Sequence, residues 1–552
     1  MSRPTRPTGP RHKTRSRRSR PISSRTEPAS TAEPQAGPSL GREWGFRRFE
    51  QDVHRAAGAS ERPPTPGVRR RPPNRIPAGY RANYPTHPEV PVSPQSSDPI
   101  DVDVIVLGLG VGGEAVAGNL ATAGLDVVGI EDGLVGGECP YWGCIPSKAM
   151  VHAAGEVRHQ EHPDWSKVAA RVRELTADWD DRAAVDRLVD KGVTFVRGAG
   201  RITDVNVVEA TDADGTVRHF RARHAIVVGT GTKAFIPPIE GLADTPLWTN
   251  REAIEADEAP RSLAVLGGGA IGLELAQVFA RFGTHVTIVE SGDRVLAVED
   301  PESSDLAEWA LGDDGVEIHL RARAEAVAHD GKTFTLSLSD GRSIEAEKLL
   351  VATGRRVDLV AIGAEALGVD PHAHALPVDG QLRVRPGGEP PAVWAVGDIT
   401  GQGAFTHVAM YQSAIVTKAI LHRTGRGAAG PDADHSALPR VTFVDPEIGA
   451  VGLTEHQARA AGLTVRIGIA DLAASSRGHI TGARGFVKVI EDVDRGVLVG
   501  ATAAGPAGGE ILGALVVAVR AAVPVATLRD MMYAYPTYHR TIESALADLD
   551  TD

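Results

Sequence analysis

Apolar residues are distributed unevenly along this chain, and their pattern divides it into two parts. Over residues 1–100 no apolar period is sustained, because arginine, proline and serine dominate. From Asp101 onwards, short apolar runs rich in valine and isoleucine alternate with longer stretches of helical period. A segment with little apolar surface to bury stays disordered. The pattern therefore predicts a disordered tail over residues 1–100 and a folded α/β protein after it.

The predicted tail allows three interpretations. Its first 26 residues contain no acidic residue, as in targeting peptides, but its many prolines oppose the amphipathic helix that such peptides form. Its positive charge would suit a tether to nucleic acid or to another anionic surface. Its composition favours a third interpretation, an unstructured extension or a start codon assigned too far upstream.

A strand, a glycine turn and a helix open the predicted folded part. The run Asp103–Leu107 predicts a strand, a G-x-G-x-x-G turn follows, and residues 114–123 have helical character. In such a turn Gly108 permits a tight bend, and Gly110 lets backbone amides approach a pyrophosphate. Gly113 allows the helix to pack closely on the strand. The pattern is typical of a dinucleotide-binding site.

This pattern occurs twice, and each copy ends in a glutamate. After the first turn a second apolar run ends at Glu131, whose carboxylate is placed to accept hydrogen bonds from a ribose. The second copy has the same residues at the same spacing, at Gly267, Gly269, Gly272 and Glu290. Two fingerprints of matched spacing predict two dinucleotide cofactors.

The only two cysteines of the chain, Cys139 and Cys144, lie in one short loop after the first fingerprint. Two thiols so close in sequence can form a small disulfide ring. Pro146 suits the first turn of a helix, whose dipole lowers the pKa of a nearby thiol. A structural staple is not expected in a long chain without a secretory signal, and the scattered histidines suggest no metal site. The loop predicts a redox-active pair.

Length and charge limit the remaining possibilities. A chain of 552 residues is too long for one core, and no apolar stretch approaches the ~20 residues of a membrane span. A net charge of -12 argues against general binding of nucleic acid. A disulfide that must cycle favours a reducing compartment. We therefore expect a soluble, cytoplasmic protein.

These motifs resemble those of the class I pyridine nucleotide-disulfide oxidoreductases, the family of dihydrolipoamide dehydrogenase, glutathione reductase and mercuric reductase. The resemblance runs from Asp101 to about Leu546. Besides the cysteine loop it rests on motifs in family order at residues 228–232, 352–355, 395–398, 439–443, 446–447 and 451–455.

The resemblance implies an α/β fold with two Rossmann-like dinucleotide-binding domains and a C-terminal α+β dimerisation domain. The FAD-binding domain would comprise residues 101–236 and 358–435, and the NAD(P)-binding domain residues 237–357. The dimerisation domain would comprise residues 436–552 and pair two subunits, so that the segment from Tyr535 to Arg540 completes the partner's active site.

The resemblance also implies roles for individual residues. Cys144 would face the flavin as the charge-transfer thiolate, and Cys139 would be the interchange thiol that attacks a substrate disulfide. Lys148 would lie beside flavin N5, paired with Glu274. The cofactor-binding positions implied, besides the glycines of the two turns and Lys148, are Glu131, Gly200, Gly231, Asp398, Thr406, His407, Glu290 and Gly354.

The acidic Glu290 would repel a 2′-phosphate, so NADH is the expected donor. Arg294 lies nearby in sequence, and its positive charge could reduce this preference, so NADPH remains an alternative donor.

The C-terminal end departs from the family pattern. Disulfide reductases of the family carry a His-Pro-Thr run followed three residues later by Glu, whereas this chain has Tyr535 and Arg540 at those two positions. A phenol ionises near pH ~10, so its use as a base at neutral pH costs about 4 kcal/mol.

A shifted base could replace the missing one. If the segment is helical, His539 would share a face with Tyr535 and Glu543, and a His539–Glu543 pair could serve. Such a pair would be displaced by one turn, about 5.4 Å, which favours an ordinary surface pair instead.

The predicted function is that of an FAD-dependent NAD(P)H oxidoreductase of dihydrolipoamide-dehydrogenase type. Hydride would pass from NADH through FAD to the cysteine pair, and electrons would go on to a small-molecule disulfide or to a quinone. One alternative is a quinone reductase or diaphorase without dithiol exchange. Two further alternatives are less favoured. Metal-ion reduction of the mercuric-reductase type would need a second cysteine pair, which this chain lacks. A non-catalytic flavoprotein subunit would have no need for the intact cysteine loop.

Overall fold

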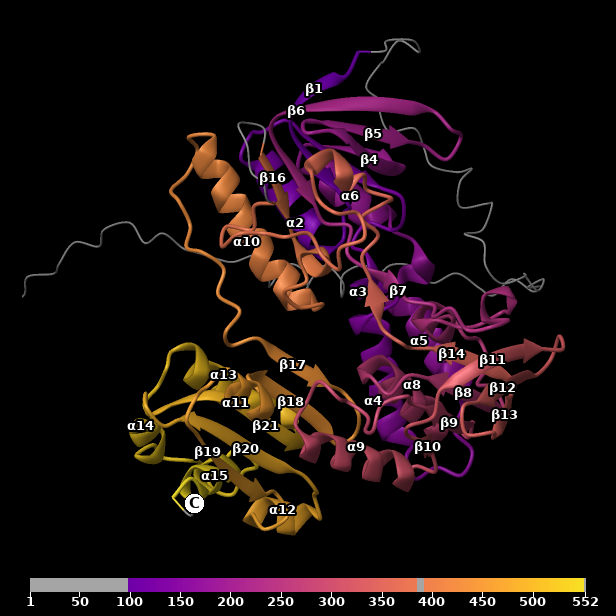
Figure 1. Cartoon of the computed structure of the whole chain (residues 1–552), viewed down its shortest axis with the longest axis vertical. Coiled ribbons are helices and arrows are strands. Elements are labelled where there is room, and N and C mark those ends of the chain that lie inside the picture. Colours follow the sequence, from indigo (N-terminus) through magenta and orange to yellow (C-terminus); the bar gives the residue numbers. More distant parts are fainter. Residues whose placement is uncertain (1–97, 385–391, 551–552) are drawn as a thin grey trace, which may run out of the picture. The chain divides into compact units, whose positions relative to one another are not determined.

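The computed structural model describes residues 98–384 and 392–550 (Figure 1). The predicted tail therefore lies outside the described residues, apart from its last three positions. The first strand, β1, begins at Ile100, one residue before the expected start of the folded part.

The first sheet contains seven strands in the order β3-β2-β1-β6-β5-β4, with β16 paired to β6. Five of them run parallel: β1 (Ile100–Leu107), β2 (Val127–Glu131), β3 (Val193–Arg197), β16 (Ala392–Ala395) and the second half of β6 (Val217–Val228). β4 (Ala199–Asp204) and β5 (Val207–Thr211) add an antiparallel extension to β6.

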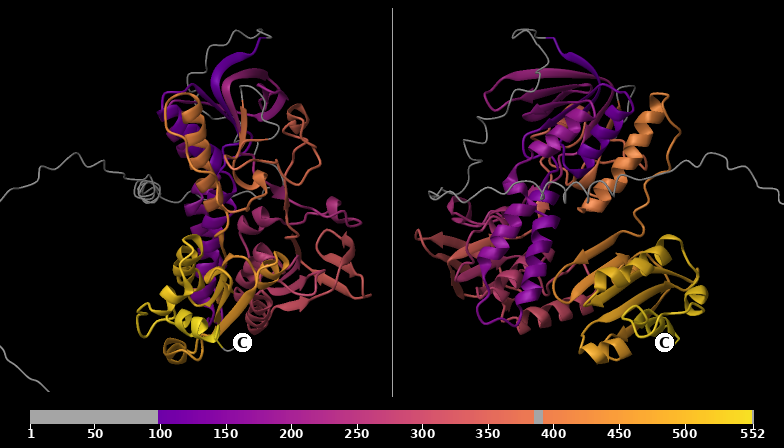
Figure 2. Two further views of the ribbon diagram at one scale, coloured as in Figure 1. Left: turned by 60° about the vertical axis from the view of Figure 1, so that its left-hand side comes forward. Right: turned by 180° about the vertical axis from the view of Figure 1, so that it is seen from behind.

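Alternation along β1 explains why this sheet is covered on both faces. Val104 and Val106 belong to one buried cluster with the helices α2 (Val111–Thr122) and α10 (Thr406–Arg423). Ile105 and Leu107 belong to a second cluster on the opposite face. Successive side chains of a strand point to opposite faces, so a continuous apolar run is needed when both are buried. Helices α2 and α10 lie side by side (Figure 2).

A second parallel sheet has the order β10-β9-β8-β14. Its strands are β8 (Ser262–Leu266), β9 (His285–Val289), β10 (Glu317–His319) and β14 (Lys348–Val351). The helix α8 (Ala270–Arg281) packs on one face through Leu275 and Phe279. The other face is covered by an antiparallel sheet of β11 (Ala324–His329), β12 (Phe334–Leu338) and β13 (Ser343–Ala346).

The cysteine loop connects the first sheet to the helices that pack on the second. A short helix, α3 (Glu138–Tyr141), is followed by α4 (Cys144–Val157). Met150 and Ala154 of α4 lie in the same buried cluster as Leu275 and Phe279 of α8. This packing brings the first turns of α4 and α8 together.

The C-terminal part is an antiparallel sheet in the order β17-β18-β21-β20-β19. Its strands are β17 (Pro439–Thr442), β18 (Glu447–Gly452), β19 (Val465–Asp471), β20 (Phe486–Asp492) and β21 (Val497–Gly505). The helices α13 (Gly508–Arg520) and α15 (Thr541–Asp548) share one buried cluster with this sheet. The predicted fold, two parallel α/β sheets and a C-terminal α+β part, is confirmed.

Within residues 98–384 and 392–550, no helix is long and apolar enough to cross a membrane.

Candidate active site

The first glycine turn is built as the motif requires. Gly108 has a φ of +88°, and a Cβ on Gly113 would lie 1.9 Å from the Gly108 carbonyl oxygen. Only glycine fits either position. The carboxylate of Glu131 accepts a 2.7 Å hydrogen bond from the Leu109 N–H and a 2.8 Å bond from the Gly133 N–H. Burial raises the pKa of Glu131 to about 7, although both hydrogen bonds oppose the shift.

The second glycine turn repeats this construction. Gly267 has a φ of +106°, and a Cβ on Gly272 would lie 2.4 Å from the Gly267 carbonyl oxygen. Glu290 accepts hydrogen bonds of 2.6 Å from the Gly268 N–H and 2.5 Å from the Gly292 N–H. The two turns are therefore equivalent in backbone and in acidic residue.

Space is available where a pyrophosphate would lie. A Cβ on Gly269, the N-cap of α8, would meet no atom within 4 Å, and one on Gly110, the N-cap of α2, would meet only the Gly229 carbonyl oxygen at 3.8 Å. Because glycine has no side chain, neither N-cap residue accepts a hydrogen bond from the N–H groups of the first helical turn. Open space, free donors and a helix dipole suit a dinucleotide phosphate, so both turns fit the predicted cofactors.

Arg294, which bears on the choice between NADH and NADPH, has its guanidinium occupied by three hydrogen bonds. Its guanidinium donates to the hydroxyl of Ser304 at 2.8 Å and to the carbonyl oxygens of Leu296 and Ala297. These bonds hold it against the first turn of α9 (Pro301–Asp313) and the loop before this helix.

The two cysteines are free thiols in different environments. Cys144 is the first residue of α4 and is exposed, whereas Cys139 is half-buried in α3. The pKa of Cys144 is lowered to about 6, chiefly by a hydrogen bond from the Cys139 thiol. A hydrogen bond from Thr406, whose Oγ1 lies 3.4 Å from the Cys144 sulfur, and the charge of Lys148 add to this effect, while burial opposes it. The same thiol–thiol bond, together with burial, raises the pKa of Cys139 far above its ordinary value.

Lys148 and Glu274 form an ion pair between α4 and α8. The Lys148 Nζ lies 2.7 Å from Glu274 Oε2 and 4.7 Å from the ring centroid of Phe443. The other carboxylate oxygen, Glu274 Oε1, accepts a 2.8 Å hydrogen bond from the Phe443 N–H. The Glu274 side chain is only 6% exposed, so its charge is held in a defined place between three segments.

Asp398 lies in a chain of hydrogen bonds that sequence patterns did not indicate. It accepts a 2.7 Å bond from the hydroxyl of Thr232, and Arg355 Nε donates to the same hydroxyl at 2.8 Å. His407, in the first turn of α10, contacts the Pro439 carbonyl oxygen at 2.8 Å. Thr406, which precedes it, contacts Cys144 instead.

The remaining predicted glycines have distinct surroundings. Gly231 and Gly354 have φ values of +63° and +113°, and neither would bring a Cβ within 4 Å of another atom. In β4, a Cβ on Gly200 would lie 2.2 Å from the Leu107 side chain. Glycine at position 200 therefore leaves room for the Leu107 side chain between the strands.

The C-terminal segment does not form the helix that would place Tyr535, His539 and Glu543 on one face. α15 begins only at Thr541, and residues 535–540 form bends and turns. The condition under which the three side chains would share a helical face is therefore not met. A residue before a proline is disfavoured in the helical region, as Tyr535 is before Pro536, and Thr537 Oγ1 holds a turn by accepting from the Arg540 N–H at 3.2 Å.

The three side chains consequently have separate partners. The hydroxyl of Tyr535, a residue that is 68% exposed, donates to Ser476 Oγ at 3.0 Å. Glu543 forms a 2.8 Å ion pair with Arg540. The ring of His539 packs on Tyr533, with centroids 5.3 Å apart.

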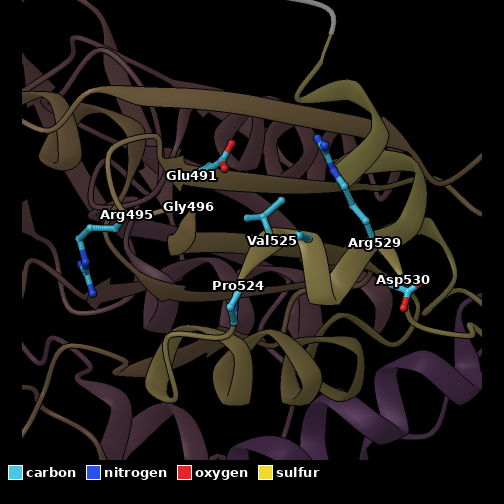
Figure 3. A pocket seen from close by; sticks show the side chains of 8 residues that line it. Glu491, Arg495, Gly496, Pro524, Val525, Arg529 and Asp530 are labelled. Carbon is cyan, nitrogen blue, oxygen red and sulfur yellow. The ribbon is translucent and has the colours of Figure 1, made fainter.

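A surface depression of about 640 Å³ lies in the C-terminal part, between the turn after β20 and α14 (Val525–Arg529) (Figure 3). Glu491, Arg495 and Arg529 line it, and none of its lining residues is a predicted site residue.

Among residues 98–384 and 392–550, no group of three or more His, Cys, Asp or Glu side chains could hold a metal ion.

The comparison with known families agrees with this architecture. The sequence profile described as "Pyridine nucleotide-disulphide oxidoreductase" matches residues 102–413, and that of its dimerisation domain matches residues 438–546. This chain belongs to that family. The pyridine nucleotide-disulphide oxidoreductases use FAD and NAD(P)H, which the two glycine turns fit. The prediction of the family and its cofactors is confirmed.

Individual relatives cover nearly the whole folded part. A mercuric reductase of Acidithiobacillus ferrooxidans is 32% identical over 84% of this chain and 85% of its own length. A dihydrolipoyl dehydrogenase of Chlorobaculum tepidum is 31% identical over 81% of this chain and 96% of its own. The HOCl-induced flavoprotein disulfide reductase RclA from Escherichia coli, solved as its Cu(II) complex, is 27% identical, with a TM-score of 0.72 over 81% of this chain and 99% of that chain.

Proposed function

We propose that this pyridine nucleotide-disulphide oxidoreductase takes electrons from NADH, holds them on the Cys139–Cys144 pair and delivers them to a quinone-type acceptor without dithiol exchange. Bound FAD supplies the two-electron chemistry that links the nicotinamide to the disulfide. The side chains of the protein bind the two cofactors, hold the two thiols and place charge beside them.

The second glycine turn supports NADH as the donor. Glu290 is held by two backbone N–H groups, so its carboxylate remains beside the position expected for the adenosine ribose. A carboxylate there accepts from a ribose hydroxyl and repels a 2′-phosphate. Arg294 cannot offset this repulsion while its guanidinium is bound to Ser304 and to backbone carbonyls.

The cysteine pair is suited to store electrons. Reduction breaks the S–S bond, adds two electrons and takes up one proton, which leaves one thiol and one thiolate. The pKa of about 6 assigns the thiolate to Cys144, and the raised pKa of Cys139 assigns the proton to Cys139. Lys148, paired with Glu274, supplies positive charge next to the thiolate.

The choice of a quinone as acceptor rests on the C-terminal segment, where a tyrosine stands at the position expected for the histidine base. A protonated Cys139 needs a base before it can attack a substrate disulfide, because only a thiolate is nucleophilic. The family's histidine is replaced by Tyr535, and His539 and Glu543 have other partners. A quinone, in contrast, can accept electrons from the flavin without thiol exchange.

The dimerisation domain supports a homodimer in which this segment faces a second subunit. Met532 is 98% exposed, Ile480 66% and Tyr535 68%, so apolar surface is available near the C-terminal segment. Light scattering should give the mass of two chains, and a monomeric mass would contradict the pairing.

The test is to reduce the purified holoenzyme anaerobically with NADH and to measure turnover with lipoamide and with menadione side by side. We expect rapid menadione turnover and lipoamide turnover lower by about 10²-fold or more, the usual contribution of a general base. Tyr535→Phe serves as a control and should change neither rate. Lipoamide turnover as fast as that of menadione would overturn the proposal and favour a disulfide reductase.

A further inference from the structure

The segment between the two cysteines is held by a tryptophan. Trp142 lies between Cys139 and Cys144, and its indole Nε1 donates a 2.6 Å hydrogen bond to Glu255 Oε1. The guanidinium of Arg251 lies over the same indole, 4.2 Å from the ring centroid. A hydrogen bond in the ring plane and a cation above it fix both the position and the tilt of the indole.

The residue before the first cysteine is held from the same side. Glu138 accepts hydrogen bonds of 2.9 Å from Arg251 Nε and 3.1 Å from Asn250 Nδ2. Asn250 Nδ2 also donates to the carbonyl oxygen of Trp142 at 2.8 Å. Hydrogen bonds from Asn250 and Arg251 therefore hold the chain on both sides of Cys139.

The gripping side chains come from one short helix, α7 (Asn250–Ile254), and its C-cap, Glu255. The helix is itself well anchored. Thr249 and Glu252 form a capping box at its start, and Ala253 and Ile254 are buried in the cluster that contains the core of α8. An anchored helix can hold a loop in one place.

We propose that Asn250, Arg251 and Glu255 are positioning residues that keep Cys139 within reach of Cys144 in both redox states. This inference rests on the proposed use of the pair as an electron store. Reduction breaks the S–S bond as two electrons enter from the reduced flavin and one proton is taken up, and re-oxidation requires the two sulfurs to meet again.

The physical basis is conformational entropy. A loop that is already held in place loses less freedom when the disulfide ring closes, so the grip of α7 favours the disulfide over the dithiol. The groups that interact with the Cys144 sulfur are Cys139, Thr406 and Lys148, and substitutions in α7 or at Glu255 alter the chemical identity of none of them.

The test is the redox equilibrium of the pair in Glu255→Ala. Holoenzyme is equilibrated with glutathione buffers of graded potential, alkylated, and the disulfide fraction is read by mass spectrometry. We expect a shift of about tenfold toward the dithiol, which corresponds to about 30 mV for a two-electron couple. Trp142→Phe keeps a ring under Arg251 but loses the indole N–H, and should shift the equilibrium in the same direction by about threefold.

Two variants control for trivial effects. Trp309→Phe makes the same substitution on the surface of α9, where the Trp309 ring also lies 4.2 Å from an arginine guanidinium, that of Arg484. Glu255→Gln retains an oxygen that can accept from the indole. Both should stay within about twofold of the wild type.

The outcomes separate the two proposals. A wild-type pair that NADH does not reduce would overturn the proposed function. A pair that NADH reduces normally, but whose equilibrium in Glu255→Ala is unchanged or shifts toward the disulfide, would overturn the positioning role alone. If Glu255→Ala fails to fold or to bind flavin, Arg251→Lys weakens the grip on Glu138 and gives the same test.

Discussion

The cysteine loop and the C-terminal segment differ in how completely their side chains are held. In the loop, Glu138, Trp142 and Lys148 each have a defined partner on another segment of the chain. In the C-terminal segment, Tyr535 and Met532 are largely exposed. If the cysteine pair stores electrons as proposed, one subunit organises that part of the site on its own. The segment that would activate a thiol consists of exposed residues and departs from the pattern that the resemblance implies.

Cys144→Ser should have the largest effect on this comparison. The variant cannot form the disulfide, so it should take up half as many reducing equivalents per subunit, since only the flavin remains to be reduced. Anaerobic titration with dithionite measures this uptake. Menadione turnover should persist, because the proposed route to a quinone needs no thiol exchange. An unchanged uptake would mean that the cysteines do not store electrons.

The double substitution Tyr535→His, Arg540→Glu should bring the C-terminal segment back to the family pattern. An imidazole oriented by a carboxylate can deprotonate Cys139, so lipoamide turnover should rise by about 10²-fold. Menadione turnover should stay the same. No gain in lipoamide turnover, with flavin content and dimer mass intact, would mean that the missing base is not what limits dithiol exchange.

Much of the fold follows from local patterns. The glycine turns were predictable because their demand is steric and lies within a few residues, as at Gly108 and Gly113. The helix at Cys144 was predictable from Pro146. The hydrogen bond between Trp142 and Glu255 was not, because 113 residues separate the two and no spacing rule connects them.

The C-terminal segment gives a second example of what spacing leaves open. A four-residue spacing between Tyr535, His539 and Glu543 is compatible with a helix, but spacing alone does not take account of Pro536 or of the turn held by Thr537. The chain of contacts from Asp398 through Thr232 to Arg355 likewise joins three segments that only the folded structure brings together.

Glu290→Ala should have a smaller effect, confined to the nicotinamide site. Loss of a charged acceptor for a ribose hydroxyl should lower kcat/KM for NADH by about tenfold and leave NADPH less affected. Steady-state rates with both donors measure the change. Arg294→Ala is the matched control and should leave the ratio of the two donors unaltered, because that guanidinium is bound to Ser304. A changed ratio in Arg294→Ala would contradict the assignment.

Thr406→Val should have the smallest effect. The pKa of Cys144 is about 6, so its thiolate is present above that pH and its alkylation by iodoacetamide should fall as the pH drops through 6. Removing the hydrogen bond from Thr406 should raise this midpoint by about half a unit, since the bond from Cys139 remains the main cause. The pH dependence of alkylation of the reduced protein measures the midpoint, and a lower midpoint would contradict the assigned role of Thr406.

The pairing of β16 with β6 has a consequence for biosynthesis. Ala392 pairs with Ala225, so the first sheet is completed only after the whole second sheet has left the ribosome. Asp398 follows directly after β16, and Thr232, its hydrogen-bond partner, was made long before. A nascent chain that ends before Ala392 therefore lacks one edge strand of its first sheet, and this sheet is completed only after the strands of the second sheet have been synthesised. Flavin capture should be a late event in synthesis, and arrested chains should gain it only once Asp398 has emerged.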